Sequence, residues 1–232
     1  MDNFIFKGLS STIFEGLVVN SLPPIVKPNK RVNKTTIDGR DGDIVEFLGY
    51  EAYDLPVTIT RLSKELDVNE IINWLNGSGQ LVLSTEPDKY YKAEVIEQID
   101  FRKLELYEPT KIVFHVQPYK YLYKERKQVF EDLTKSIVIV NVGLEDSTPL
   151  IKIMGSGTIE FQLEGITIFT YTFPDDENEV IIDSEKQDAY LGTVLKNRNM
   201  IGEFPILKSK KNNVVVNGNV TKLEVEANSC WL

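Results

Sequence analysis

The sequence contains one cysteine, one histidine and no long apolar run. The single cysteine, Cys230, excludes a disulfide within the chain and fits folding in a reducing compartment. One histidine and one cysteine cannot supply the usual nitrogen and sulfur ligands of a zinc site within a chain. No apolar stretch approaches the roughly 20 residues of a membrane-spanning helix, and the start, Met1-Asp2-Asn3-Phe4, does not resemble a signal peptide. We therefore expect synthesis in a cytoplasm, no membrane partner, and no metal or cofactor.

The chain also has no excess of basic over acidic side chains. The chain has 26 Lys and Arg against 35 Asp and Glu, and its formal net charge is −9. Binding to nucleic acids depends largely on basic side chains that neutralise phosphates, so we expect no specific nucleic-acid binding. The acidic charge would let DNA slide past the protein without sticking, or it serves solubility alone.

The residues of a catalytic site do not come together in the sequence. His115 lies in a predicted strand, on the face opposite to its apolar neighbours, and has no second partner for a catalytic triad. No glycine-rich phosphate-binding loop follows a strand. The carboxylates at Asp38, Asp41 and Asp43 could hold a hard cation, but their spacing is not that of an EF-hand, and an exposed turn is the alternative. We expect that the protein is not an enzyme.

Apolar residues recur with a period of two, which is typical of strands. This pattern covers 57–62, 112–116 and 159–163, and Glu164-Gly165 then predicts a tight hairpin that returns through 166–173 with a β-bulge. Asn217-Gly218, between apolar runs, predicts a second hairpin. The fold is therefore expected to be mainly β.

One helix is predicted over 68–75, where Asp67 can cap the first turn and Glu70 completes a capping box. A strong strand ends at Pro118, and a charged stretch follows it before new short strands begin. We therefore predict two domains, residues 1–124 and residues 125–232.

Residues 28–55 belong to the least regular part of the sequence, which is typical of a functional or disordered segment. Their mixture of apolar and charged side chains fits a surface that a partner buries, and the alternative is a floppy surface loop. The candidate interface residues are Arg40, Asp41, Phe47, Leu48, Tyr50 and Tyr53.

The order of short motifs along the whole chain resembles the distal tail protein (Dit) family of siphophages. In the first half the motifs are Gly39-Arg40-Asp41-Gly42, Val57–Leu62, Trp74-Leu75, Leu81–Ser84, Pro87–Ala93 and Phe114–Tyr121. In the second half they are Asn141-Val142-Gly143, Ser147–Ile151, Gly155-Ser156-Gly157, Ile181–Glu185, Gly202–Pro205 and Trp231.

This resemblance implies a fold and a role. The N-terminal domain would be a β-sandwich with one short helix and an extended hairpin, and six copies would form a ring. The C-terminal domain would be a galectin-like or carbohydrate-binding-module-like β-sandwich. The ring would join the tail tube protein to the tail-associated or tip protein around the DNA path, in the virion of a phage, a prophage or a tail-like bacteriocin. The C-terminal domain would lie outside the ring, and in some relatives it also docks a receptor-binding protein.

A carbohydrate-binding module is the alternative function. A sugar site in the C-terminal domain, for a saccharide of the host cell wall, would need exposed aromatic rings. The candidates are Tyr190 and Trp231, whereas Tyr171 alternates with Phe169 and Phe173 and is expected in the core.

Overall fold

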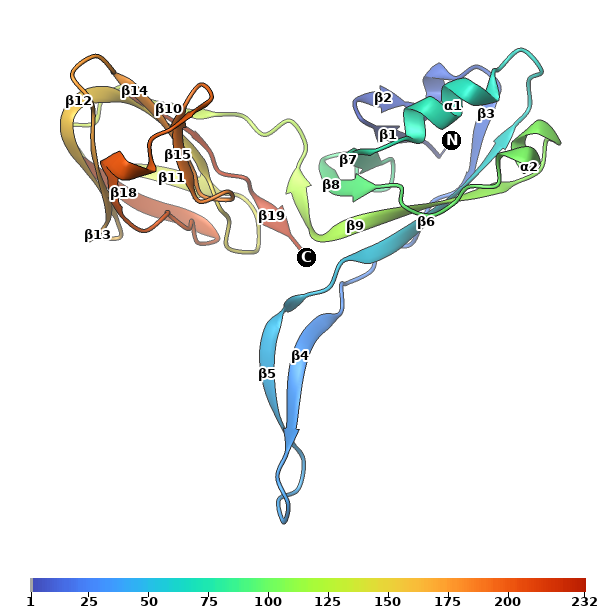
Figure 1. Ribbon diagram of the computed structural model, residues 1–232, viewed down its shortest axis with the longest axis horizontal. Coiled ribbons are helices and arrows are strands. Elements are labelled where there is room, and N and C mark those ends of the chain that lie inside the picture. The colour runs from blue at the N-terminus through green and yellow to red at the C-terminus, as the bar shows by residue number, and fades with distance from the viewer. Residues whose placement is uncertain (1) are drawn as a thin grey trace. The chain divides into compact units, whose positions relative to one another are not determined.

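The computed structural model describes residues 2–232 and divides into two compact units (Figure 1). The first unit ends at Tyr123 and the second runs from Lys124 to Trp231, so the division falls one residue before the boundary expected from the sequence. Strands dominate both units, which confirms the prediction of a mainly β fold. None of the helices in the described part of the chain is long and apolar enough to cross a membrane.

The first unit is built on one antiparallel sheet with the strand order β2-β1-β7-β8-β9-β6-β3. A separate pair, β4 and β5, extends from it (Figure 1). The strands are β1 (Phe4–Phe6), β2 (Leu9–Ser10), β3 (Leu17–Ser21), β4 (Lys30–Thr36), β5 (Asp43–Tyr50), β6 (Tyr53–Arg61), β7 (Ser78–Leu83), β8 (Lys89–Glu94) and β9 (Thr110–Leu122). The helices are η1 (Ser11–Ile13), α1 (Val68–Leu75) and α2 (Phe101–Glu105).

The core of this unit forms because alternate residues of β6 and β9 point to the same side of the sheet. Val57 lies opposite Ile112, and Leu55 lies opposite Phe114. All four side chains are buried. The period of two in the sequence is therefore confirmed for these strands.

Helix α1 packs on this buried side of the sheet, as the sequence predicts. The Asp67 side chain accepts a hydrogen bond from the Asn69 amide at 2.9 Å, and this cap starts the helix at Val68. Trp74 donates its indole N–H to the Phe6 carbonyl at 3.0 Å and stacks on Phe4 with ring centroids 5.0 Å apart. The second helix, α2, is a correction to the expectation of one helix: at five residues it is too short to show a helical period.

Strand β9 runs beyond Pro118, so the strand end predicted at that residue is wrong. On one side, its pairing with β6 has already stopped at Val116. On the other side, the register with β8 jumps from Lys120 to Val116, so Pro118 lies in an irregularity of the ladder. A proline is tolerated there because no partner strand requires its missing N–H.

The second unit is a curled sheet with the path β10-β18-β12-β14-β15-β16, to which β11, β13 and β17 add. The strands of this sheet are β10 (Gln128–Phe130), β11 (Ile137–Asn141), β12 (Leu150–Leu163), β13 (Ile166–Thr172), β14 (Glu179–Asp183), β15 (Asp188–Leu191), β16 (Val194–Leu195), β17 (Met200–Gly202) and β18 (Lys210–Glu226). The unit also contains the short helix η2 (Asn197–Asn199) and strand β19 (Cys230–Trp231), which is not part of this sheet. One half of β12 pairs with β14 and the other half with β13, so the sheet folds over its own core.

The hairpin predicted at Asn217-Gly218 is wrong. Strand β18 passes through these residues without turning and pairs with β12 on both sides of them. The register shifts between Ser156 and Glu160, which marks an irregular corner in both strands. Gly218 has φ of 107°, and a Cβ there would lie 2.7 Å from the Thr158 carbonyl oxygen. Pairing with a strand distant in sequence thus overrides the local turn preference.

The hairpin predicted at Glu164-Gly165 is confirmed. Both residues have positive φ, as a tight turn between β12 and β13 requires. The predicted bulge is also present, because the register shifts between Phe161 and Gln162. Beyond it, Tyr171 is buried in the core as expected.

The two ends of the second unit are tied to each other. The Glu125 carboxylate accepts hydrogen bonds from the Ser229 amide at 3.1 Å and from the Ser229 hydroxyl at 2.5 Å. Residues near the start and near the end of this unit therefore lie side by side.

Candidate functional site

The hairpin of β4 and β5 is the main feature that the core of the first unit does not explain. Residues 30–36 and 43–50 form an antiparallel ladder that projects away from the sheet (Figure 1). This confirms the extended hairpin that the family resemblance implies, since these residues form paired strands. An isolated two-stranded hairpin is only marginally stable in water.

The register gives the hairpin two different faces. Val32 lies opposite Phe47, and Lys34 lies opposite Val45, so these four side chains share one face. Val45 is 56% exposed and Phe47 is 52% exposed. We call the surface formed by Lys30, Val32, Lys34, Val45 and Phe47 the apolar–basic face.

A β-bulge sets the direction of the hairpin near its base. The register shifts between Arg31 and Val32, which leaves Leu48 without an opposite residue. The Arg31 guanidinium donates to the Leu48 carbonyl at 3.0 Å, and Gly49 adopts φ of 123°. Bulges bend and twist the strand that contains them, so these residues determine where the apolar–basic face points.

Aromatic rings connect the apolar–basic face to the sheet. Phe47 contacts Tyr50 edge to face at 5.1 Å, and Tyr50 contacts Tyr119 of β9 in the same way at 6.0 Å. The Lys30 ammonium lies 5.6 Å from the centre of the Phe47 ring. The face is therefore continuous with the rigid part of the unit.

The structure separates the six predicted interface residues into three groups. Arg40 and Asp41 lie in the exposed turn between the strands. Phe47, Leu48 and Tyr50 lie on β5. Tyr53 begins β6 and packs against the core of the first unit, where burial raises its pKa.

The carboxylates of the acidic turn lie in an exposed segment. Among residues 2–232, no group of three or more His, Cys, Asp or Glu side chains is arranged to hold a metal ion. Asp43 instead accepts a hydrogen bond from the Thr36 hydroxyl at 3.1 Å. His115, the histidine considered for catalysis, lies 2.8 Å from Asp54 in an exposed cross-strand pair, so a structural contact accounts for it.

The two saccharide candidates lie on separate strands of the second unit. Tyr190 is on β15, whose neighbours are β14 and β16, and the Lys186 ammonium lies 5.9 Å from its ring centre. Trp231 is on β19. Both side chains are half-buried, and no shared strand ladder joins them into one platform.

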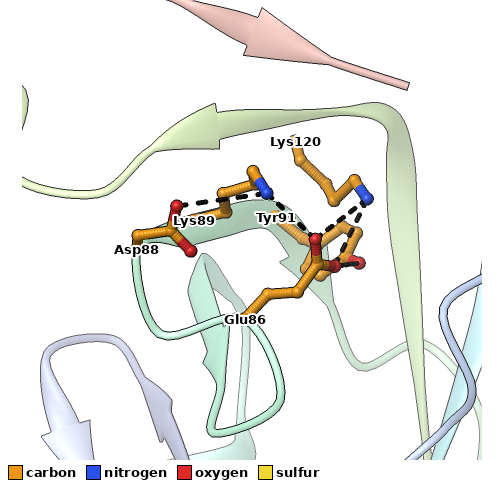
Figure 2. A network of polar contacts seen from close by, with 5 residues as sticks. All are labelled: Glu86, Asp88, Lys89, Tyr91 and Lys120. Atoms are coloured by element: carbon orange, nitrogen blue, oxygen red, sulfur yellow. Dashed lines mark hydrogen bonds and ion pairs between the residues drawn. The ribbon is translucent and has the colours of Figure 1, made fainter. Parts of the chain in front are cut away.

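A buried ionic network near the base of the hairpin was not predicted (Figure 2). Glu86 accepts hydrogen bonds from Lys120 at 3.2 and 3.3 Å, from Lys89 at 3.1 Å and from the Tyr91 hydroxyl at 3.2 Å. The Lys120 side chain is only 6% exposed. One signal could have indicated it: Lys120 continues the even-numbered series 112, 114 and 116, which faces the core.

Electrostatics explain how this network remains charged. Burial opposes ionisation of Glu86, but hydrogen bonds and charge from Lys89 and Lys120 outweigh it and lower the pKa of Glu86. Burial and the nearby Glu86 carboxylate raise the pKa of Tyr91, so its hydroxyl remains a donor. The network fixes β9 beside Tyr119, which is the residue that the hairpin base contacts.

A hollow of about 530 Å³ lies at the other end of β6 from the hairpin. Its lining includes Ile13 and Leu62, which are 63% and 65% exposed. The exposed carboxylates Glu15, Glu65 and Glu70 also line it, and no basic side chain is among its lining residues. We call this surface the acidic hollow.

Comparisons with known proteins identify the fold. No family model matches the sequence, and no curated protein matches it. A crystal structure of the SPP1 Dit protein, described as a paradigm of hub adsorption apparatus in phages that infect Gram-positive bacteria, matches with a TM-score of 0.74 and 15% identity. The match covers 97% of this chain and 98% of that chain.

Structures of the phage p2 baseplate in its activated conformation also match over 97% of both chains. The one with calcium has a TM-score of 0.55 and 12% identity, and the one with strontium has 0.54 and 13%. The chain therefore has a Dit-like fold across both of its units, which confirms the resemblance at the level of the fold.

Proposed function

We propose that this chain is a structural component of a phage tail tip, in which copies of the first unit assemble into a ring. The observation that carries the proposal is the match to the SPP1 Dit structure over nearly the full length of both chains. A shared fold does not by itself specify a function, so the surface of the first unit must also fit an assembly role. The projecting hairpin, with its exposed apolar side chains, supports that role.

In this proposal the ring contains six copies and joins the tail tube protein to the tail-associated or tip protein. Its lumen is the path of the DNA, and the net charge of −9 supports passage without adhesion. The second unit would lie outside the ring, available to a receptor-binding protein. The chain would act as a structural part and not as a catalyst, and it would be located at the tail tip of the virion.

Size-exclusion chromatography with light scattering, over a concentration series, tests self-assembly. We expect a particle of six copies of the 26.5 kDa chain, with ring-shaped images in negative stain. Phe47→Asp should shift the particle toward the monomer without unfolding it, because Phe47 is exposed in the single chain.

The matched control is Ile201→Asp, which places the same charge on a 76% exposed residue of the second unit. This variant should assemble like the parent chain. A parent chain that remains a monomer throughout the series contradicts the ring. Equal assembly of the two variants would remove the hairpin from the interface.

A further inference from the structure

We propose that Asn76 is a site of spontaneous deamidation in the folded chain, and that Glu160 protects Asn217 from the same reaction. Asparagine followed by glycine occurs twice in the sequence, at Asn76-Gly77 and at Asn217-Gly218. Glycine has no side chain to shield its backbone nitrogen, so the two pairs share one intrinsic reactivity. The structure gives them different surroundings. This inference does not depend on the proposed function, because it concerns the folded single chain.

The reaction consumes water and no other reagent. The Gly77 nitrogen loses its proton to hydroxide and attacks the side-chain carbonyl carbon of Asn76. A carbon–nitrogen bond forms, and the side-chain nitrogen leaves with added protons as ammonia. Water then opens the cyclic succinimide at either of its carbonyl groups, which gives aspartate or isoaspartate. The reaction takes up one water and releases one ammonia, so an amide becomes a carboxylate.

Neither reacting group at position 76 is held by another part of the described chain. Asn76 is the exposed C-cap of α1, and its side-chain amide has no hydrogen bond within residues 2–232. The Gly77 N–H also lacks a backbone partner among these residues. The Lys7 ammonium donates an exposed hydrogen bond to the Asn76 carbonyl at 2.8 Å. That bond holds the oxygen between the two groups and leaves both of them unrestrained.

The backbone at Asn76 permits the approach of the two groups. Asn76 has ψ of 132°, and ring closure requires this angle to rotate until the Gly77 nitrogen faces the side-chain amide. Gly77 has φ of 86°, and a Cβ there would meet nothing within 4 Å. The rotation lies between the end of α1 at Leu75 and the start of β7 at Ser78. Glycine makes such a connection easy to rotate.

The surroundings of Asn217 oppose the same reaction, although Asn217 and Gly218 are exposed too. The Asn217 side-chain amide donates to the Glu160 carboxylate at 3.0 Å. Strand β18 pairs with β12 on both sides of this position, so rotation of the peptide disturbs the ladder. The negative charge of Glu160 also disfavours a second anion beside it. Because both sites are exposed, restraint is the difference between them.

Conversion of Asn76 changes the end of a helix that covers the core. A carboxylate at this position lies at the negative end of the α1 dipole, where it is unfavourable. Isoaspartate also lengthens the backbone by one carbon directly after the buried residues Trp74 and Leu75. We therefore expect the converted chain to unfold about 2–4 °C below the unconverted chain.

Peptide mapping of the full-length chain measures both sites in one sample. The parent protein is incubated at mildly alkaline pH, digested and analysed by mass spectrometry, in which each conversion adds about 1 Da. We expect Asn76 to convert at least about tenfold faster than Asn217, since Asn217 alone must first lose a hydrogen bond to a carboxylate. Equal rates, or faster conversion of Asn217, would overturn the proposal.

Two controls separate the effect of the fold from that of the sequence. In denaturant both pairs lose their surroundings, so the two rates should agree within about twofold. A tenfold difference that persists in the unfolded chain would show that the fold is not its cause. In the folded chain, Glu160→Ala should accelerate conversion of Asn217 and leave the rate at Asn76 unchanged. An unchanged rate at Asn217 would overturn the protection by Glu160.

Ion-exchange chromatography provides the material for the stability measurement. One conversion takes the formal net charge from −9 to −10, so converted chains elute separately and their unfolding temperature can be measured. The matched control is Asn76→Gln, whose longer side chain does not close the same ring. It should keep its elution and its unfolding temperature through the same incubation. An Asn76→Gln chain that shifts as much as the parent would overturn the assignment to Asn76.

Discussion

Two antiparallel strand pairs in this molecule, β4–β5 and β12–β18, have the same backbone hydrogen-bonding pattern. They differ in how far their side chains are exposed to solvent. The pair β12–β18 places Ile151, Phe161 and Leu223 in the core of the second unit. The pair β4–β5 leaves both of its faces in solvent. Burial of apolar area stabilises the first pair within a single chain. The second pair has comparable apolar side chains but gains that stabilisation only when another molecule covers it.

The largest expected effect comes from replacing one phenylalanine in each strand pair. Phe161→Ala should destabilise the second unit by about 3–5 kcal/mol, because it leaves a cavity in a closed core. Phe47→Ala should change the free energy of unfolding of the monomer by less than about 0.5 kcal/mol. Denaturant unfolding of the monomeric chains measures both values, and equal losses would contradict the contrast.

The ionic network at the hairpin base gives the next largest effect. Glu86→Ala leaves the Lys120 ammonium buried without its main partner, which should destabilise the first unit by about 3 kcal/mol. Replacement of both residues, Glu86→Leu with Lys120→Met, is the control and should recover most of the loss.

The same network predicts a pH dependence. Because the folded pKa of Glu86 is lowered, its contribution is present above the unfolded carboxyl pKa, about 4.3. It is lost as the pH falls through the lower folded value. Unfolding of the parent chain measured between pH 7 and 3 should therefore show a steeper acid loss than unfolding of Glu86→Gln. Parallel curves would show that the network does not stabilise the fold.

The corner of β18 offers a smaller effect with an internal control. Gly218→Ala meets both an unfavourable φ and the Thr158 carbonyl, and should cost about 2–3 kcal/mol. Gly157→Ala has positive φ but open space around it, and should cost about 1 kcal/mol. Thermal unfolding measures the stability of both variants. If the Gly157 variant is as unstable as the Gly218 variant, the contact with the Thr158 carbonyl is not the cause of the destabilisation.

The same contrast explains which elements could be predicted from the sequence. Strands β6, β9 and β12 have one face in a core, so their apolar residues alternate visibly, and α1 has both a cap and a stripe. Strand β4 buries no face, so Lys30–Thr36 lacks that period and appeared irregular. The hairpin entered the prediction only through the family resemblance.

Long-range contacts account for the features that the sequence did not reveal. Lys120 and Glu86 are 34 positions apart, and only the pairing of β8 with β9 brings them together. Asn217-Gly218 has the local signature of a turn, but its neighbours are held by a partner strand more than 50 positions away. Neither effect is encoded in a short window of residues.

The two hydrogen bonds between Glu125 and Ser229 have a consequence for the evolution of the chain. Both residues belong to the second unit, so this unit carries its own closing contact. A gene could therefore exchange the unit for another at one junction without refolding what precedes it. The Glu125–Ser229 clasp would move with the exchanged unit, so a single junction before Glu125 is enough for such a graft.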